Sequence, residues 1–261
     1  MGRKKNLKGI DTETMDIINE KFNNGYYCES SVNYVSRNKS LDYKIFLKSK
    51  NKKQEELINE IKHKEITFCS GSAGTGKSYI AMAVALDLIR QDNQFKKITL
   101  IVPTVQSDIE LGFLKGSLEE KIFPHAEPHL YTMEKIINKS GGNGKIAVEM
   151  LRKNGLLDIK PVSFLRGATL DEQIILIEES QNLPVSAFKT ILTRLGDNCK
   201  MVFLGDIDQI DNKELRKKGV RSGLDYAIEK LSELKEVGTI TFNKDEIVRN
   251  PLISKILDNW E

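Results

Sequence analysis

The chain has 261 residues, of which 39% are hydrophobic and 30% charged, with a formal net charge of +3 and three cysteines, Cys28, Cys69 and Cys199. These values fit one globular domain with or without a small appendage, and they exclude a strongly charged molecule that binds polyanions through its overall field. No apolar run reaches the length of a membrane span, no signal peptide follows the basic residues 1–8, and the scattered cysteines favour reduced thiols, so we expect a cytoplasmic protein with no membrane partner.

The first part of the chain differs in composition from the rest. Residues 1–50 are polar and rich in Lys, Asn and Ser, which predicts an N-terminal arm or small subdomain with one short strand at residues 43–47. The core, residues 51–261, begins with a helix over residues 52–63, because apolar side chains recur there at helical spacing. Residues 66–69 follow as an apolar run and predict a buried strand.

Strands and helices are predicted to alternate through the core. Residues 79–90 have helical length and good helix formers, and the segment 140–145, rich in glycine, predicts a mobile loop. Short β-branched runs predict the further strands 98–102, 174–177, 201–204 and 239–242. This alternation favours an α/β fold with a doubly wound, mainly parallel sheet and helices on both faces.

A phosphate-binding loop joins the first strand of the core to its helix. Residues 71–78 match the pattern G-x-x-x-x-G-K-[ST] in the strand-loop-helix context that separates this motif from chance. Backbone N–H groups would converge on the phosphates, Lys77 would reach the β and γ phosphates, and the Ser78 hydroxyl would bind Mg²⁺. We therefore predict a P-loop NTPase whose ATP site contains Gly71, Ser72, Ala73, Gly74, Thr75, Gly76, Lys77, Ser78 and Tyr79.

Two acids directly follow the predicted strand 174–177. Glu178 is placed to hold the metal through its water shell, and Glu179 to polarise the attacking water as a general base. The alternative is the start of a helix, where acids are favoured by the helix dipole. Their position downstream of a P-loop favours the catalytic interpretation.

Polar residues also follow the predicted strand 201–204. Asp206 and Gln209 are candidates for sensing the γ-phosphate, because polar groups at the carboxyl ends of parallel strands meet in one crevice, although an ordinary polar turn is the alternative. Arg221 and Arg249 are candidates for stabilising transition-state charge in the same or a neighbouring subunit. Each arginine alone is more often a surface salt-bridge partner.

The motifs together resemble the PhoH-like proteins, phosphate-starvation-inducible ATPases related to the superfamily 1 helicase core. The resemblance spans roughly residues 50–261. It is carried by Gln54, the P-loop, residues 111–114, Gly116, residues 118–121, 164–167, 169–170, 178–182 and 205–211, Val248, Arg249 and Pro251. This chain has Glu-Glu-Ser-Gln-Asn at 178–182 where the family usually reads Asp-Glu-Ala-Gln-Asn, and Val102 where an arginine commonly stands.

The resemblance implies a RecA-like ATPase core and roles for single residues. Gln54 would read adenine, Lys77 and Ser78 would bind phosphate and Mg²⁺, Glu179 would activate water, Gln209 would sense the γ-phosphate, and Arg249 would be the helicase-type arginine. One RecA-like core implies a homo-oligomer whose subunits complete each other's sites, a hexameric ring in the family. The 50 residues before the core are too few for a nuclease-type PIN domain, so RNase activity is not expected.

Two functions stay open from the sequence. The first is an oligomeric ATPase that acts on RNA or DNA, in which ATP binding moves Lys-rich or loop surfaces such as residues 140–145 against the nucleic-acid strand. The alternative is a slow or non-hydrolysing ATP switch that controls a protein partner. A small-molecule kinase is disfavoured, because no lid or acceptor site is recognisable and residues 205–209 argue against it. Two basic clusters would contact nucleic-acid phosphates or form solvated helix faces: Lys48, Lys50, Lys52 and Lys53, and Arg216, Lys217, Lys218 and Arg221.

Overall fold

The computed structural model describes most of the predicted core. The described residues are 43–91, 94–102, 118–165, 167, 169–212, 215–217 and 220–248. Predictions that concern Arg249, Lys218, Arg166, residues 1–42 and residues 111–116 therefore lie outside them.

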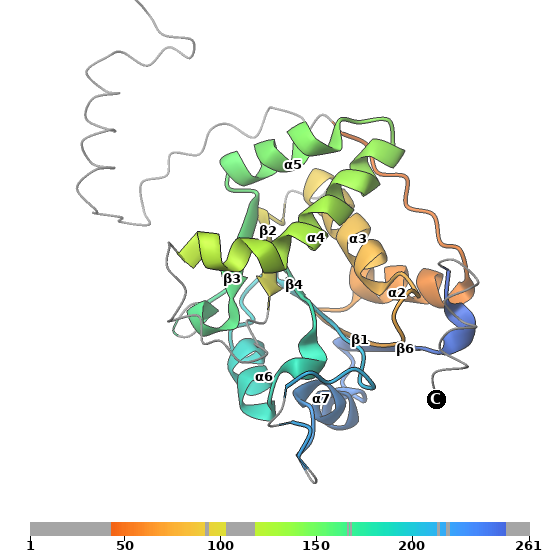
Figure 1. The fold of residues 1–261 in the computed structure, drawn as a ribbon, viewed down its shortest axis with the longest axis vertical. Helices are drawn as coiled ribbons and strands as arrows, with labels where there is room; N and C mark the ends of the chain where they lie inside the picture. Colours follow the sequence, from red (N-terminus) through yellow and green to blue (C-terminus); the bar gives the residue numbers. More distant parts are fainter. Residues whose placement is uncertain are drawn as a thin grey trace, which may run out of the picture. The chain divides into compact units, whose positions relative to one another are not determined.

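A six-stranded, all-parallel sheet forms the centre of the described chain (Figure 1), in the order β3-β2-β4-β5-β1-β6. This order and the glycine loop after β1 confirm the predicted RecA-like P-loop fold. The strands are β1 (Ile66–Gly71), β2 (Lys97–Val102), β3 (Leu157–Pro161), β4 (Gln173–Ile177), β5 (Lys200–Leu204) and β6 (Val237–Phe242).

Helices cover both faces of the sheet (Figure 1). Alternate strand residues point to opposite faces, so Ile174 and Leu176 belong to one hydrophobic core and Ile175 and Ile177 to the other. The first core lies under α2 (Lys52–His63), α3 (Lys77–Gln91), α4 (Leu118–Lys139) and α5 (Gly144–Lys153). The second lies under α6 (Val185–Leu192) and α7 (Gly223–Leu231). None of the described helices is both long and apolar enough to cross a membrane.

Strand order brings three functional loops together. β5 lies between β1 and β4, and all three run in parallel, so the P-loop after β1, the acids after β4 and the polar residues after β5 leave the sheet at the same edge. Short 3₁₀ turns complete the description: η2 (Val162–Leu165), η3 (Ser180–Asn182) and η4 (Lys244–Glu246).

The prediction of a strand at residues 43–47 is wrong. This segment pairs with none of the described strands and lies against the helical layer instead, where Tyr43 and Ile45 are buried in the first core. The Tyr43 hydroxyl donates to the Leu86 carbonyl at 3.1 Å, and the Phe46 amide donates to Ser140 Oγ at 2.9 Å. The alternation of apolar and polar residues here reflects packing against helices rather than strand pairing.

Two further elements differ from the sequence prediction. β3 was not predicted, because charged residues interrupt its short run, which ends at Pro161 and pairs only with β2 at the sheet edge. The predicted glycine loop ends earlier than expected, since α5 begins at Gly144. The side chain of Asn143 caps α5 by accepting from the Ile146 amide at 3.2 Å, and Gly144 N–H donates to Asn138 Oδ1 at 2.7 Å. The mobility of this loop stays a prediction.

Candidate nucleotide-binding site

The P-loop lies tightly between β6 and α2. Gly71 has φ of +133°, and a Cβ there would lie 2.2 Å from the Phe242 carbonyl oxygen; at Gly76, with φ of +89°, a Cβ would lie 2.8 Å from Gln54 Nε2. The backbone conformation favours glycine at both positions, and at Gly71 the lack of space beside the Phe242 backbone also requires it. The loop opens directly into α3, whose N-terminus presents backbone N–H groups that suit an anion.

Lys77 folds back onto the loop that precedes it. Its Nζ donates to the carbonyl oxygens of Gly71 and Ser72, the latter at 2.9 Å. Burial lowers the pKa of Lys77, while the nearby carboxyl groups of Asp206, Glu178 and Glu179 favour its charged form. The ammonium group therefore lies between the phosphate loop and three acids.

Ser78 and Glu178, 100 positions apart, meet at the start of α3. Ser78 Oγ donates to Glu178 Oε2 at 2.8 Å, and Glu178 is only 3% exposed. Burial raises the pKa of Glu178 to about 8, and its Oε1 is buried with no hydrogen-bond partner in the described part of the chain. A hydroxyl beside a carboxyl with an unsatisfied oxygen fits Mg²⁺, which needs few protein ligands when phosphates supply the rest. No cluster of three acidic, His or Cys side chains that could hold a metal by itself occurs among the described residues.

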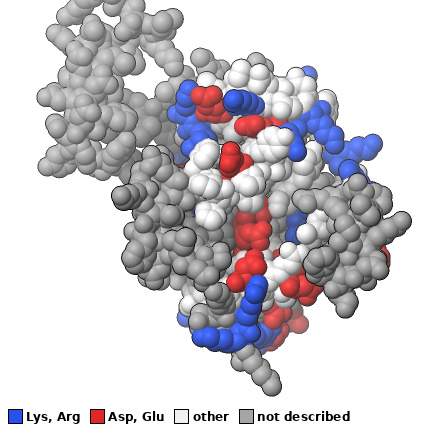
Figure 2. Space-filling view, in the orientation of Figure 1, with Lys and Arg blue, Asp and Glu red and all other residues white. Residues whose placement is uncertain are grey.

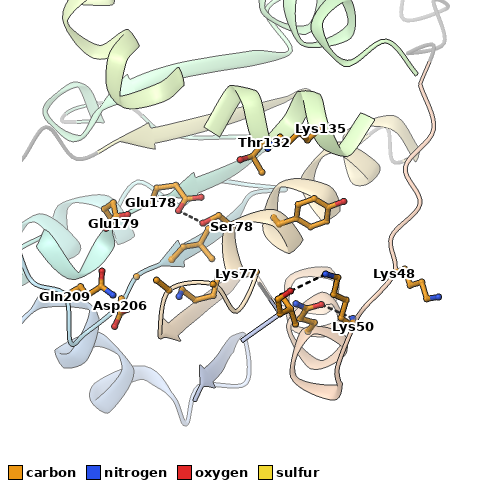
Figure 3. Close-up of a pocket in the computed structure, with 18 of the residues that line it drawn as sticks. Lys48, Lys50, Lys77, Ser78, Thr132, Lys135, Glu178, Glu179, Asp206 and Gln209 are labelled. Carbon is orange, nitrogen blue, oxygen red and sulfur yellow. Dashed lines mark hydrogen bonds between the residues drawn. The ribbon is translucent and has the colours of Figure 1, made fainter. Parts of the chain in front are cut away.

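Glu179 stands at the rim of the site in a strained conformation. Its φ of +49° places this non-glycine residue in the left-handed region, between the end of β4 and η3. The side chain is exposed, and its Oε2 accepts a hydrogen bond from Gln181 Nε2 at 2.7 Å. The two acids therefore have different partners and occupy different places at the site (Figure 3): Glu178 contacts Ser78, whereas Glu179 contacts Gln181.

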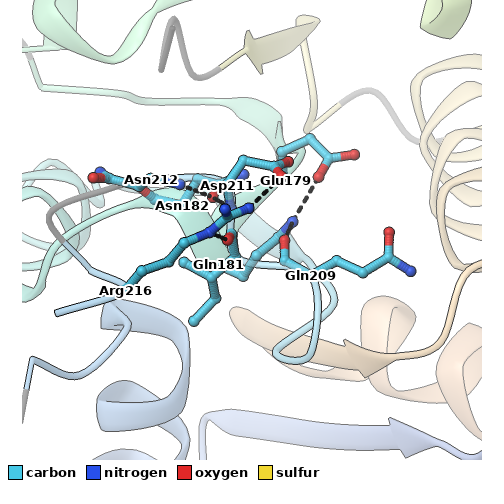
Figure 4. Close-up of polar contacts among 8 residues, drawn as sticks. Glu179, Gln181, Asn182, Gln209, Asp211, Asn212 and Arg216 are labelled. Atoms are coloured by element: carbon cyan, nitrogen blue, oxygen red, sulfur yellow. Dashed lines mark hydrogen bonds and ion pairs between the residues drawn. The ribbon is translucent and has the colours of Figure 1, made fainter. Parts of the chain in front are cut away.

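Gln181 and Asn182 tie the segment after β4 to the segment after β5 (Figure 4). Gln181 Nε2 also donates to the Gln209 carbonyl at 3.0 Å, and Gln181 Oε1 accepts from the Asp206 amide at 3.1 Å. Asn182 Oδ1 accepts from the amides of Asp211 at 2.7 Å and Asn212 at 3.0 Å. These hydrogen bonds hold the segment after β4 against the segment after β5. The roles of Gln181 and Asn182 were not predicted from the sequence.

A cavity of about 450 Å³ lies among these groups (Figure 3). Its lining combines the P-loop, the two acids after β4, Gln209 after β5 and several lysines. Gly71, Ser72 and Thr75 do not line the cavity but shape the loop. The predicted residues that line it are Gln54, Ala73, Gly74, Gly76, Lys77, Ser78, Tyr79, Glu178, Glu179, Asp206 and Gln209.

Gln54 lies at the join between α2 and the P-loop. Its Nε2 donates to the Thr75 carbonyl at 2.8 Å, and its Oε1 accepts from the Lys50 amide at 2.9 Å. The side chain is 3% exposed. Its amide therefore supports the phosphate loop, and adenine recognition by Gln54 stays a prediction.

Two groups of residues at the cavity were not predicted as site residues. Thr132, Lys135 and Lys139 come from α4, and Lys48 and Lys50 from the segment before α2 (Figure 3). Lys139 Nζ lies 5.7 Å from the centre of the Tyr79 ring, and Lys50 Nζ donates to the Val248 carbonyl at 3.4 Å. The first basic cluster was visible in the sequence, but no sequence signal distinguishes the α4 lysines from ordinary surface lysines.

Arg221 does not line the cavity of its own subunit, and a role in the site of a neighbouring subunit stays a prediction. It pairs instead with Asp225 and Glu229 on α7, with Nε 2.8 Å from Asp225 Oδ2. In the second basic cluster Arg216 likewise pairs with Asp211 at 3.2 Å. In the view of Figure 2, acidic side chains run along the middle of the described surface between basic groups, so this face is not uniformly basic.

Comparison with known proteins identifies relatives over most of the chain. A family model described as "PhoH-like protein" matches residues 46–261. The PhoH-like protein of Bacillus subtilis is 35% identical over 208 residues, covering 80% of this chain and 62% of the relative. Protein PhoH of Escherichia coli is 32% identical over 210 residues, covering 80% of this chain and 56% of the relative. The chain thus spans 62% of the length of the first relative and 56% of the length of the second.

Solved structures show a weaker likeness. A large terminase from a thermophilic bacteriophage, in complex with ADP, has a TM-score of 0.44 at 14% identity, covering 80% of this chain and 49% of that chain. The Pif1 helicase from Candida albicans has a TM-score of 0.36 at 13% identity, covering 80% and 43%. Both scores are low, and the fold assignment rests on the strand order and the P-loop described above.

Proposed function

The chain belongs to the PhoH-like protein family, and from the geometry of its site we propose that it binds ATP with Mg²⁺ and hydrolyses ATP to ADP and phosphate. The observation that carries this proposal is the hydrogen bond between Ser78 and Glu178 beside the P-loop. It joins the two side chains that an NTPase needs for its metal, at a cavity of about 450 Å³. A purely structural glycine turn would not require this pair.

Each residue of the site has a distinct part in the proposed reaction. The P-loop amides and Lys77 bind and orient the phosphates, with Lys77 exchanging the carbonyls of Gly71 and Ser72 for phosphate oxygens. Glu179, held by Gln181, accepts the proton of the attacking water. Gln209 would contact the γ-phosphate. The hydrogen bond from Gln181 to the Gln209 carbonyl would then transmit the presence of the phosphate to the segment after β4. Gln54 and Tyr79 line the cavity, and we propose that the base and ribose lie beside them.

Magnesium would be held by Ser78 directly and by Glu178 through water. When bound, it neutralises developing charge on the transferred phosphate. The raised pKa of Glu178 means that its carboxyl holds a proton near pH 7, and a neighbouring cation favours release of that proton. The protein therefore offers a buried acid whose charge appears when a cation is present.

We further propose that the protein works in the cytoplasm as a homo-oligomer, a ring with RNA or DNA as its partner. No arginine is among the described residues that line the cavity, and Arg221 is engaged elsewhere. Phosphoryl transfer benefits strongly from an arginine, so one supplied by Arg249 or by a neighbouring subunit would complete the site. Lys48 and Lys135 at the rims of the cavity would also attract a polyanion.

A slow or non-hydrolysing ATP switch is the second candidate function. It is favoured by Glu178, whose burial and raised pKa oppose the charged form that a metal requires. In that case the coupling between Gln181 and Gln209 would transmit the bound state of the nucleotide to a protein partner rather than serve turnover.

Steady-state ATP hydrolysis by the wild type and Lys77→Ala, each with and without single-stranded RNA and DNA, tests the proposal. For a nucleic-acid ATPase we expect turnover that a strand stimulates and that Lys77→Ala lowers by about 100-fold or more. Tight ATP binding without turnover in every condition would support the switch. No nucleotide binding by the wild type would contradict both functions.

A further inference from the structure

Helix α4 places a histidine beside the buried carboxyl of Glu178. Nδ1 of His129 lies 3.7 Å from Glu178 Oε1, while Ser78 occupies the other oxygen, Oε2, at 2.8 Å. Within the described part of the chain, Oε1 is buried and accepts no hydrogen bond. The ammonium of Lys77 does not satisfy it, because that group donates to the carbonyls of the P-loop.

The imidazole of His129 is held by the packing of α4. Ala126 and Met133, three residues before and four after His129, are fully buried and share its face of the helix. Thr132, on the next turn, lines the nucleotide cavity. The His129 side chain is 17% exposed. The ring is therefore fixed at the boundary between the hydrophobic core and the site.

A buried glutamate needs two fixed contacts to hold its carboxylate in one orientation. Its side chain has three rotatable bonds, and the hydrogen bond from Ser78 constrains only Oε2. Carboxylates that hold metals are usually oriented by further hydrogen bonds from groups that do not touch the metal. His129 is in position to supply such a contact to Oε1 after a shift of a few tenths of an ångström.

We propose that His129 is a positioning residue for the metal-holding carboxylate: its Nδ1–H donates to Glu178 Oε1 and keeps Oε2 directed at Ser78 and the water shell of Mg²⁺. The inference rests on the proposed function, since it assigns a role within the same metal site. It predicts that α4 contributes to Mg²⁺ affinity, and that this contribution depends on the length of the acid at position 178.

Equilibrium binding of a fluorescent, non-hydrolysable ATP analogue, titrated with Mg²⁺, tests the inference without any need for turnover. The variants are His129→Leu, His129→Asn, Glu178→Asp and the double variant His129→Leu with Glu178→Asp. Asn keeps a side-chain N–H donor near the place of Nδ1. His125→Leu is the matched control, because His125 lies one turn earlier on α4 and is exposed. Thermal melts of all variants without nucleotide establish that each is folded.

We expect His129→Leu to raise the Mg²⁺ concentration for half-maximal binding by about tenfold or more, His129→Asn to restore it largely, and His125→Leu to leave it unchanged. In the Glu178→Asp background, His129→Leu should have little effect, because the shorter acid withdraws from the imidazole. An equal shift in both backgrounds, or no shift in His129→Leu, would overturn the inference while leaving the proposed function intact. Absence of Mg²⁺-dependent binding by the wild type would overturn both. If His129→Leu does not fold, His129→Asn becomes the test. A folded His129→Asn variant whose Mg²⁺ concentration for half-maximal binding exceeds that of the wild type by more than about threefold would contradict the inference.

Discussion

Gln181 Nε2 lies 2.7 Å from Oε2 of Glu179, the exposed acid at the rim of the nucleotide cavity. The same nitrogen donates to the Gln209 carbonyl at 3.0 Å, so one buried amide holds both the proposed general base and the segment after β5. The proposed catalytic acid–base chemistry therefore depends on a residue that does not line the cavity itself.

Removal of the proposed general base should separate binding from turnover. In Glu179→Gln the side chain keeps its size but no longer accepts a proton, so we expect hydrolysis to fall by about 10²- to 10⁴-fold. Nucleotide affinity should change little, because the P-loop contacts remain. Single-turnover hydrolysis and equilibrium ATP binding check this prediction. Unchanged turnover would show that Glu179 is not the base.

Loss of the Gln181 amide should disturb both stability and turnover. In Gln181→Leu the buried amide of Asp206 loses its acceptor, which costs about 1–3 kcal/mol of unfolding free energy, and Glu179 loses its positioning contact. We expect turnover to fall by about tenfold or more, with ATP affinity altered less. Urea unfolding and steady-state kinetics measure the two effects. Gln91→Leu, on the exposed end of α3, is the control and should leave turnover unchanged.

The second hydrophobic core should depend strongly on one aromatic cluster. The centre of the Phe203 ring lies 4.7 Å from the centre of the Phe188 ring and 5.2 Å from the centre of the Phe68 ring, and Phe203 is fully buried. Phe203→Ala should lower the unfolding free energy by about 3–5 kcal/mol, because it removes these contacts and leaves a cavity. Chemical denaturation measures the loss. Phe46→Ala, at a position 70% exposed, should cost less than about 0.5 kcal/mol.

Tyr43 should make stability fall at alkaline pH. Burial raises the pKa of Tyr43, and its hydroxyl donates to the Leu86 carbonyl. The unfolded tyrosine loses its proton near pH 10, whereas the folded one keeps it, so unfolding becomes easier as pH rises above about 10. The difference in unfolding free energy between the wild type and Tyr43→Phe should therefore be constant from about pH 7 to 9 and shift against the wild type above about pH 10. A difference that stays constant above about pH 10 would contradict this prediction.

Much of the fold was predictable because its signals are local. Five of the six strands, the first helix of the core and the P-loop follow from runs of apolar residues and from one motif with its flanking elements. A common site for Ser78 and Glu178 was also predictable, because residues that follow parallel strands leave the sheet at the same edge. Their direct hydrogen bond was not predictable, because β5 lies between β1 and β4 in the sheet.

The amino-acid sequence by itself therefore determined the α/β class, the phosphate loop and the two acids after β4. Only the tertiary structure decided that residues 43–47 pack on helices, that Arg221 pairs with acids on α7, and that α4 brings His129 and Lys135 to the site. The physical reason is the range of the interactions. Periodicity and turn chemistry act between residues close in sequence, whereas the packing of α4 over β2 and α3 depends on side-chain shapes contributed by distant segments.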